Sequence, residues 1–366
     1  MNTCYCPNWE RTKERFSAWW RHEKIGIPLM RIVADCKPVQ DILPVEGFLN
    51  PEDIYLNAAK ITNNYYNYCR THCFLEDAYP SVDLNIGPGS MALYLGAEPR
   101  FTEETVWFQE CVEDWSIWGE LSFDESNHWW KTHVDMIKTA KELSRGNFLV
   151  NIPDIVENFD ILSALRGPQN LCFDLVESPE IIGKLINQVD DLYFRYYEAM
   201  YEIVKDTDNS SSYTGFMVWG PGRTAKIQCD FCALISPEHF IEYAQPSLLK
   251  QCQRLDNSIY HLDGPGAIRH VPALMDIAEL KAVQWTCGAG QPDGGCERWY
   301  PIYDQVREAG KNLWVHICDG DSGDWVESCR RLIRRYGPDC FYFIFPDFMN
   351  KKNAEEASLA IREACM

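Results

Sequence analysis

The chain has 366 residues, of which 46% are hydrophobic and 13% aromatic, so it can bury a substantial core and is not expected to be disordered. Acidic residues outnumber basic ones by 54 to 34, and the formal charge of −20 argues against nucleic acid and anionic membranes as partners. The sequence contains no transmembrane-length apolar run, and its charged start lacks the apolar stretch of a secretory signal. We therefore expect a cytoplasmic protein without a membrane span.

The sixteen cysteines are scattered at irregular spacings, unlike the dense framework of a small secreted domain. We expect them to be reduced and mostly to pack as small apolar residues. The motif Cys229-x-x-Cys232 invites a zinc or redox interpretation, but a single pair of this kind is a weak signal. Both cysteines stand near a helix start, so core packing is favoured for them.

The first 145 residues have an irregular apolar pattern. Strands are expected at 27–34 and 81–86, and helices at 50–69 and 125–146. The segment 92–125 fits neither the helical nor the strand period. It is expected to be an excursion over one end of the fold.

From about residue 145 onwards, short β-rich runs alternate with longer helical patterns. A helix is expected to begin at Ser178-Pro179-Glu180, because proline suits the first helical turn. The expected strands are 147–152, 213–219, 226–230, 257–263, 281–285, 312–317 and 340–345. Helical patterns cover 178–205, 236–252, 267–277, 298–311, 322–337 and 353–364. Continuously apolar strands that alternate with helices are typical of parallel strands buried on both faces.

Both an open doubly wound sheet and a (β/α)8 barrel satisfy this order. The count favours the barrel, since about five strand–helix units follow residue 145 and three more fit before it. No Gly-x-Gly-x-x-Gly loop follows a strand, which argues against a dinucleotide-binding sheet. We predict an α/β fold, a (β/α)8 TIM barrel of residues 81–366 with an N-terminal helical extension of residues 1–80, in a single domain overall. The pair Trp19-Trp20 is expected in the core between a helix and the barrel.

In such a barrel, reactive groups lie at the C-terminal ends of the strands, where the loops converge. His261 and Asp263 end one strand, in YHLDGPG, and residues two apart on a strand point to the same side. Further strand-end residues with titratable, polar or aromatic side chains are Gln228, Cys229, Asp230, Cys232, Trp285, Cys287, His316, Cys318, Asp319 and Asp347. This repetition indicates a site more strongly than any single pair. For His261 and Asp263 alone, a structural hydrogen-bonded pair is commoner than a metal site.

Five blocks stand in order along the chain: DILSALRGPQNLCFDLVESPE, GRTAKIQCDFCALISPEHFIEYAQPSLL, YHLDGPGAIRH, AVQWTCGAG and AGKNLW. They resemble the uroporphyrinogen decarboxylase superfamily, and the similarity runs from about Ser81 to the C-terminus. The resemblance implies a (β/α)8 barrel. It also implies a group that includes decarboxylases of haem synthesis and zinc-dependent, corrinoid-linked methyltransferases, and that is related to cobalamin-independent methionine synthase. One barrel hosts many reactions, so the resemblance specifies the fold more closely than the reaction.

The decarboxylases of this superfamily carry an arginine-rich segment near the N-terminus, and only Arg31 stands in the corresponding region here. The methyltransferases commonly have His-x-Cys and a later cysteine, which together bind Zn²⁺. Here the pair is His261 and Asp263, and Asp347 stands near the later position. Imidazole nitrogen and carboxylate oxygen also bind zinc, and a set without thiolate makes the metal a harder Lewis acid, suited to an ether or amine leaving group.

The resemblance therefore implies a methyltransferase that moves a methyl group between a small O-, N- or S-methyl compound and a corrinoid (cobalamin) protein, with the assistance of zinc. His261, Asp263 and Asp230 are the predicted catalytic residues, and His261, Asp263 and Asp347 the predicted metal ligands. The predicted substrate-binding residues are Trp219, Gln228, Trp285, His316 and Arg166. The corrinoid is expected on a partner protein, because the chain lacks an Asp-x-His-x-x-Gly signature. A homodimer is an open option for the assembly.

Two alternatives remain. One is a cofactor-free decarboxylase of a tetrapyrrole or a smaller carboxylic acid. In it, Asp230 or Asp263 would protonate a pyrrole-like ring, and Arg31, Arg100 and Arg166 would bind carboxylates. The other is a non-catalytic barrel that binds a corrinoid or a tetrapyrrole.

Overall fold

The computed structural model describes residues 4–38 and 40–366 and has a mixed α/β fold. Its main sheet has seven strands in the order β2-β1-β13-β12-β11-β10-β9. They are β1 (Leu29–Asp35), β2 (His72–Glu76), β9 (Thr224–Gln228), β10 (Asn257–Asp263), β11 (Ala282–Thr286), β12 (Asn312–His316) and β13 (Phe341–Ile344). From β9 through β13 to β1 the neighbours are parallel, whereas β2 is antiparallel to β1.

The remaining strands form three short ladders. They pair β3 (Ser81–Val82) with β6 (Leu149–Val150) in parallel, and pair β4 (Glu98–Phe101) with β5 (Val106–Gln109) and β7 (Ser211–Tyr213) with β8 (Val218–Gly220) in antiparallel. One bridge, between Ile152 and Tyr213, links the β3–β6 ladder to the β7–β8 hairpin. Among the described residues no ladder joins β1 to β3, so the closed eight-stranded barrel stays a prediction.

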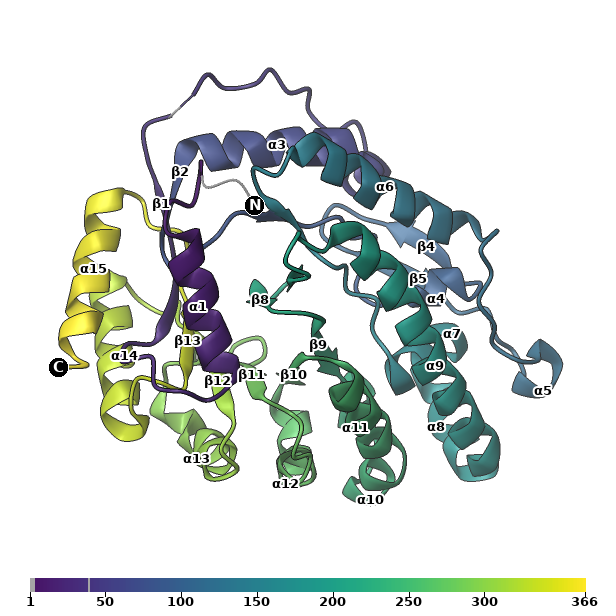
Figure 1. Ribbon diagram of the computed structural model, residues 1–366. Helices are drawn as coiled ribbons and strands as arrows, with labels where there is room; N and C mark the ends of the chain where they lie inside the picture. The colour runs from purple at the N-terminus through teal and green to yellow at the C-terminus, as the bar shows by residue number, and fades with distance from the viewer. Residues whose placement is uncertain (1–3, 39) are drawn as a thin grey trace.

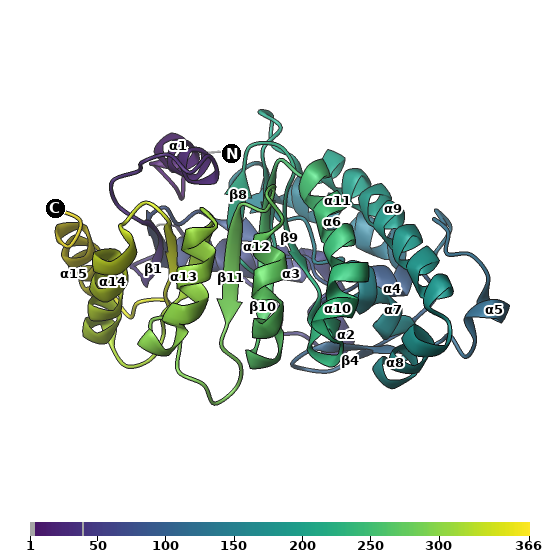
Figure 2. The ribbon, with the colours of Figure 1, turned by 90° about the horizontal axis from the view of Figure 1, so that it is seen from below.

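Helices cover the outside of the main sheet. Figure 1 shows α11 to α15 following one another along one side of the strands and α9, α6 and α3 along the other, and Figure 2 shows the first group from below. The longer helices are α1 (Trp9–Trp20), α3 (Ala58–Thr71), α6 (His128–Ser144), α7 (Asn158–Arg166), α8 (Pro168–Glu177), α9 (Pro179–Val204), α11 (Gln245–Arg254), α13 (Tyr300–Glu308), α14 (Ser322–Tyr336) and α15 (Lys351–Glu363). The shorter ones are α2 (Pro51–Leu56), α4 (Met91–Tyr94), α5 (Trp115–Trp118), α10 (Pro237–His239) and α12 (Val271–Met275). None of the helices in the described part of the chain combines the length and the apolar character that crossing a bilayer requires.

The N-terminal helix α1 closes the N-terminal end of the strands. The side chains of Trp19 and Trp20 are buried, which confirms the prediction that this pair lies in the core. The ring of Phe16 lies 5.1 Å from that of Tyr342 on β13, in an edge-to-face contact. Asn312, the first residue of β12, donates from Nδ2 to the carbonyl oxygen of Trp19 over 2.7 Å. This end of the sheet is therefore sealed by aromatic packing.

The register of the parallel strands aligns polar side chains near the opposite end. His261 on β10 pairs with Gln228 on β9 and with Gln284 on β11. Asp263 stands two residues further along β10, opposite Thr286, at the point where both strands end. Because side chains alternate between the two faces of a strand, all five residues share one face. The sheet thus gathers them at its C-terminal edge.

Some predicted elements are interrupted. The helix predicted over 50–69 is divided into α2 and α3 at Asn57, whose side chain accepts a hydrogen bond from the backbone of Lys60 and caps α3. The strand predicted over 213–219 is the β7–β8 hairpin, in which Gly215 supplies a backbone φ of +78°. The division of the chain at residue 80 stays a prediction, and β1 and β2 of the first segment lie within the main sheet.

Candidate metal centre

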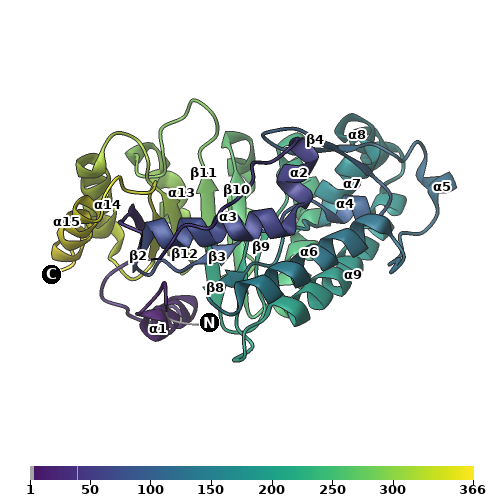
Figure 3. The same cartoon turned by 90° about the horizontal axis from the view of Figure 1, so that it is seen from above.

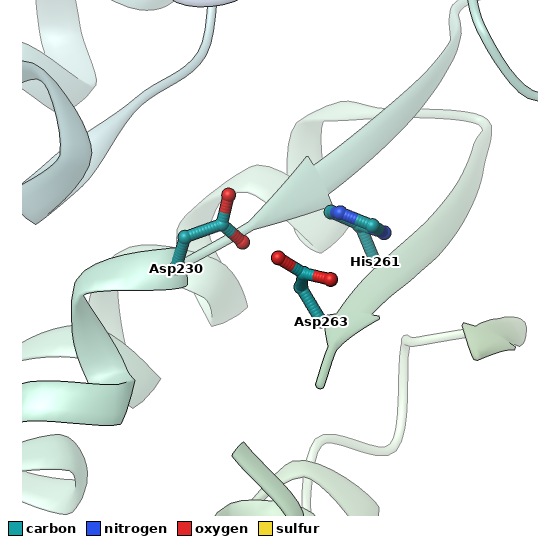
Figure 4. A group of neighbouring side chains, drawn as sticks. All are labelled: Asp230, His261 and Asp263. Carbon is teal, nitrogen blue, oxygen red and sulfur yellow. The ribbon is translucent and has the colours of Figure 1, made fainter. Parts of the chain in front are cut away.

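Three side chains meet at the C-terminal ends of β9 and β10. Asp230 is the second residue after the end of β9, and His261 and Asp263 lie at the end of β10. One ligand atom from each lies within 4.8 Å of the others, and Figure 4 shows the carboxylates and the imidazole pointing toward one another. His261 is half-buried, whereas the two aspartates are exposed, so the group is open on one side. An imidazole nitrogen and two carboxylate oxygens form a set of atoms that can bind a divalent metal.

The His261 ring is held in one orientation by Gln284. Nδ1 of His261 donates to Oε1 of Gln284, and Nε2 of that amide donates to Oγ1 of Thr286 over 2.9 Å. Since a neutral imidazole has one donor and one acceptor nitrogen, Nε2 of His261 keeps its lone pair. Burial and the positive charge of Lys226 lower the pKa of His261, so the ring is neutral at physiological pH. This is the form of histidine that binds metals.

Asp230 holds its proton more tightly than an ordinary aspartate. Although solvent reaches this side chain, the surrounding protein removes part of its hydration and raises its pKa to about 8. The negative charges of Asp160 and Asp263 raise the pKa further, and Lys226 offsets only part of the effect. A cation bound at this place would relieve the repulsion.

A second layer of acids comes from the loop after β6 and from the start of α7. Asp160 accepts hydrogen bonds from the backbone amides of Asp230 (2.9 Å) and Phe231 (2.8 Å). The side-chain amide of Gln228 donates to Asp160 over 2.9 Å and to Asp230 over 3.0 Å. Glu157 is fully buried, accepts from the backbone amide of Gln228 over 2.6 Å, and has its pKa raised well above the ordinary value by burial. These contacts fix Asp230 in place.

Lys226 is the cation buried among these acids. Its side chain is 1% exposed and forms an ion pair with Asp154 over 2.8 Å. It also donates to Oε1 of Gln228, which turns the amide group of Gln228 toward Asp160 and Asp230. One lysine cannot balance the surrounding carboxylates, so the end of the sheet is electronegative.

The loop that carries Asp154 and Glu157 has a strained backbone. Val156 has φ +55° and Asn158 has φ +42°, in the left-handed region that costs about 1–2 kcal/mol per residue. Nδ2 of Asn158 donates to the carbonyl oxygen of Gln228 over 2.7 Å, which ties the loop to β9. Strain of this kind is retained where it positions functional groups.

Sequence analysis did not name Asp154, Glu157, Asp160 or Lys226. Asp154 stands two residues after the strand predicted over 147–152, so the same rule for strand ends would have found it. Lys226 lies within a strand whose other side chains are also buried, and no sequence signal separates it from an ordinary lysine.

A cavity of about 580 Å³ adjoins the three-residue group. Its lining includes Asp263, Gln284 and the predicted substrate-binding residues Trp285 and His316. The ring of Phe216, from the β7–β8 hairpin, lies 5.1 Å from that of His261 and forms one wall. The pKa of His316 is lowered by burial, so this wall adds no positive charge at neutral pH. The cavity is large enough for a small organic molecule.

A second cavity, of about 530 Å³, lies on the other side of the same hairpin. Met217 lines it, together with Arg31 on β1 and Asp83 just after β3. Burial raises the pKa of Asp83, while hydrogen bonds from Asn151 and from the hairpin act against the shift. Asp83 is a further strand-end acid that sequence analysis did not name.

Two predicted substrate-binding residues, Trp219 and Arg166, line neither of these cavities. The ring of Trp219 packs 5.5 Å from that of Trp9 under α1, because β8 runs antiparallel to β7 and returns toward the closed end. Arg166 forms an ion pair with Asp174 over 2.7 Å and donates to the backbone carbonyl of Glu113 over 2.6 Å. Its charge is therefore used in joining α7 to α8.

The predicted third metal ligand, Asp347, is not brought to His261 and Asp263. It forms an ion pair with Arg31 over 3.0 Å and accepts a hydrogen bond from the hydroxyl of Tyr68. Asp230 takes its place in the group. Of the arginines considered for a decarboxylase, Arg100 lies on β4, in a separate two-stranded ladder.

A second group, formed by Asp293, Cys318 and Asp319, also has ligand atoms within 4.8 Å of one another. Here, however, Asp293 accepts hydrogen bonds from the backbone amides of Cys318 (2.6 Å) and Asp319 (2.8 Å). This carboxylate stabilises the loop after β12. Cys229 and Cys232 are buried, which confirms the prediction of core packing for them.

Comparison with known proteins finds similarity at the level of structure. No family model matches the sequence, and no curated protein does so. The structure is similar to that of a methyltransferase from Methanosarcina mazei, with a TM-score of 0.60 over 96% of this chain and 98% of that chain. The two share a fold. At 11% sequence identity the likeness shows the fold alone, while the closed barrel, the substrate, the zinc ion and the corrinoid partner remain predictions.

Proposed function

We propose that the protein is a methyltransferase that transfers a methyl group between a small O-, N- or S-methyl compound and a corrinoid protein. A divalent metal, zinc in the first instance, would be held by Asp230, His261 and Asp263. The observation that carries the proposal is the convergence of one neutral imidazole and two carboxylates at the open end of the sheet. The fold shared with a methyltransferase supports the class of reaction.

The residues present fit a metal. Nitrogen and oxygen donors are ordinary zinc ligands, and three protein ligands leave a position for a substrate atom. Burial and, after it, repulsion from neighbouring carboxylates raise the pKa of Asp230, and a divalent cation would relieve that repulsion. When bound, the metal supplies Lewis acidity, which polarises the heteroatom that carries the methyl group.

The protein's own residues position the reactants. Gln284 and Thr286 keep Nε2 of His261 free for the metal, and Asp160 holds the backbone of Asp230. A small methyl compound would occupy the 580 Å³ cavity beside Asp263. A corrinoid protein would approach the same end, since α1 closes the opposite one. The cavity is lined by aromatic rings such as Phe216 and Trp314 and by polar groups such as Gln284, so it would suit a small donor that carries a polar group beside its methyl group.

The test is a methyl-transfer assay with free cobalamin as the acceptor. Zinc-loaded protein is incubated with cob(I)alamin and a panel of methyl ethers, methylamines and methyl thioethers, and methylcobalamin is followed by its absorption spectrum. We expect conversion with at least one class of donor, and its loss after chelation or in His261→Ala. His128→Ala, on an exposed part of α6, serves as the control and retains activity. Turnover that survives both chelation and His261→Ala contradicts the proposal.

A further inference from the structure

A third cavity, of about 410 Å³, lies on the face of α3 opposite the one that lines the 530 Å³ cavity. Asn63, Tyr66 and Arg70 are spaced by three and four residues, so they share one face of the helix, and all three line this cavity. Tyr65 and Tyr68 lie on the other face and line the 530 Å³ cavity described above. Figure 3 shows α3 lying across the strands. The outer cavity is therefore separate from the candidate metal centre.

The charge of this cavity is opposite to that of the chain. The protein carries a formal charge of −20, yet the described residues that line the cavity include Arg70 and Arg145 and no aspartate or glutamate. The guanidinium group of Arg145 has no hydrogen-bond or ion-pair partner within the described residues. Two positive groups around one concave space favour an anion.

Arg70 is held in place before any ligand arrives. Nη1 donates to the backbone carbonyl of Asp41 over 2.7 Å, and the guanidinium group lies 5.6 Å from the centre of the Tyr66 ring. Its Nε atom is buried and has no hydrogen-bond partner among residues 4–38 and 40–366. A buried donor without a partner costs about 1–3 kcal/mol.

The wall of the cavity joins α3 to the end of α6. The hydroxyl of Tyr66 donates to the carbonyl oxygens of Leu143 (3.0 Å) and Ser144 (2.8 Å). Asn147, just beyond α6, donates from Nδ2 to the same hydroxyl over 3.0 Å. These bonds fix the backbone at the end of α6, directly before Arg145, relative to α3.

We propose that this cavity binds a small organic anion whose phosphate or carboxylate head group lies between Arg70 and Arg145. The planar fork of a guanidinium group matches the geometry of both head groups, and charge-assisted hydrogen bonds of this kind are the stronger ones. Tyr5 and Tyr66 give the cavity aromatic walls, against which the organic part of the ligand would pack. This site is independent of the methyl-transfer chemistry proposed above.

Arg145 offers a substitution that spares the fold. It directly follows α6 as its C-cap and has a left-handed backbone with φ +48°, a conformation that asparagine and glycine adopt more readily than arginine. Arg145→Asn therefore removes the charge without a conformational penalty, and Arg145→Gly gives a second variant at the same position. Arg334→Gln, on an exposed part of α14, removes one positive charge elsewhere and serves as the control.

The experiment is calorimetric titration of the full chain at low ionic strength with inorganic phosphate, phenyl phosphate and benzoate. We expect one site per chain, weakened about tenfold or more in both Arg145 variants and unchanged in the Arg334 control. Tighter binding of phenyl phosphate than of benzoate assigns a phosphate head group, and the reverse order assigns a carboxylate. The proposal is overturned if wild type binds none of the three probes, or if folded Arg145→Asn or Arg145→Gly binds as tightly as wild type.

Discussion

The two ends of the parallel strands contrast in chemistry. At the N-terminal end, α1 places Phe16, Trp19 and Trp20 against the sheet, and each is at most 1% exposed. At the C-terminal end, Asp230 and Asp263 are exposed and stand beside a half-buried histidine. The closed end is built from side chains that gain stability by burial. The open end holds carboxylates that repel one another. The stabilising aromatic contacts and the candidate metal centre therefore lie at opposite ends of the same strands.

The largest expected effect of a single substitution is on stability, at the N-terminal end of the strands that α1 closes. Trp19→Ala removes a fully buried indole that packs 4.7 Å from Trp20, and should lower the free energy of unfolding by about 3–5 kcal/mol. Urea denaturation measures this loss. Metal binding per folded chain should not change, and the separation of the two ends is wrong if it falls in step with stability.

At the open end the expected pattern is the reverse. His261→Ala should weaken zinc binding more than about a hundredfold, because loss of a residue that only hydrogen-bonds to a metal ligand typically costs about 10–100-fold. The free energy of unfolding should change little. Competition with a chelating dye measures the affinity. Cys318→Ala is the matched control, since the carboxylate beside it is already bound to backbone amides. Equal losses in both variants would place the metal elsewhere.

A smaller effect on zinc binding is expected at Gln284, which would act on the metal only through its hydrogen bond to His261. Gln284→Leu removes the acceptor that orients His261, and should weaken zinc binding about tenfold to a hundredfold. Gln284→Glu keeps an oxygen acceptor and should restore most of the affinity. If the two variants bind zinc equally well, Gln284 does not act through the histidine.

The smallest effect is the pH dependence of metal binding. Because the pKa of Asp230 is raised to about 8, its carboxyl group keeps a proton below that pH, and a metal must displace it. Zinc affinity should therefore rise about tenfold per pH unit from pH 6.5 to 8 and then level off, since His261 is already neutral there. In Asp230→Asn the affinity should be lower, and this dependence should disappear. An unchanged slope in that variant would assign the proton to another group.

The helices and strands of the C-terminal half of the chain could be predicted from the sequence, because they depend on patterns among neighbouring residues. Apolar runs and helix starts such as Pro179 give β10 to β13 and α9, and the period of two places His261 and Asp263 on one face. The rule that reactive groups gather at strand ends named Asp230 as well.

The remainder depends on contacts between segments far apart in the sequence. Asp160 lies beside Asp230 because a strained loop folds against β9. Asp347 lies away from His261 and forms an ion pair with Arg31. Trp219 lies beside Trp9 of α1 because a turn at Gly215 reverses the chain where a continuous strand was expected. Neither hydrophobic period nor motif spacing carries information of this kind.

The most direct test of the central claim is equilibrium dialysis against zinc, followed by metal analysis of wild type and of a variant with Asp230→Asn, His261→Ala and Asp263→Asn combined. The account predicts one zinc ion per chain in wild type and none in the folded variant. Wild type without bound zinc, or a variant that retains it, would contradict the account.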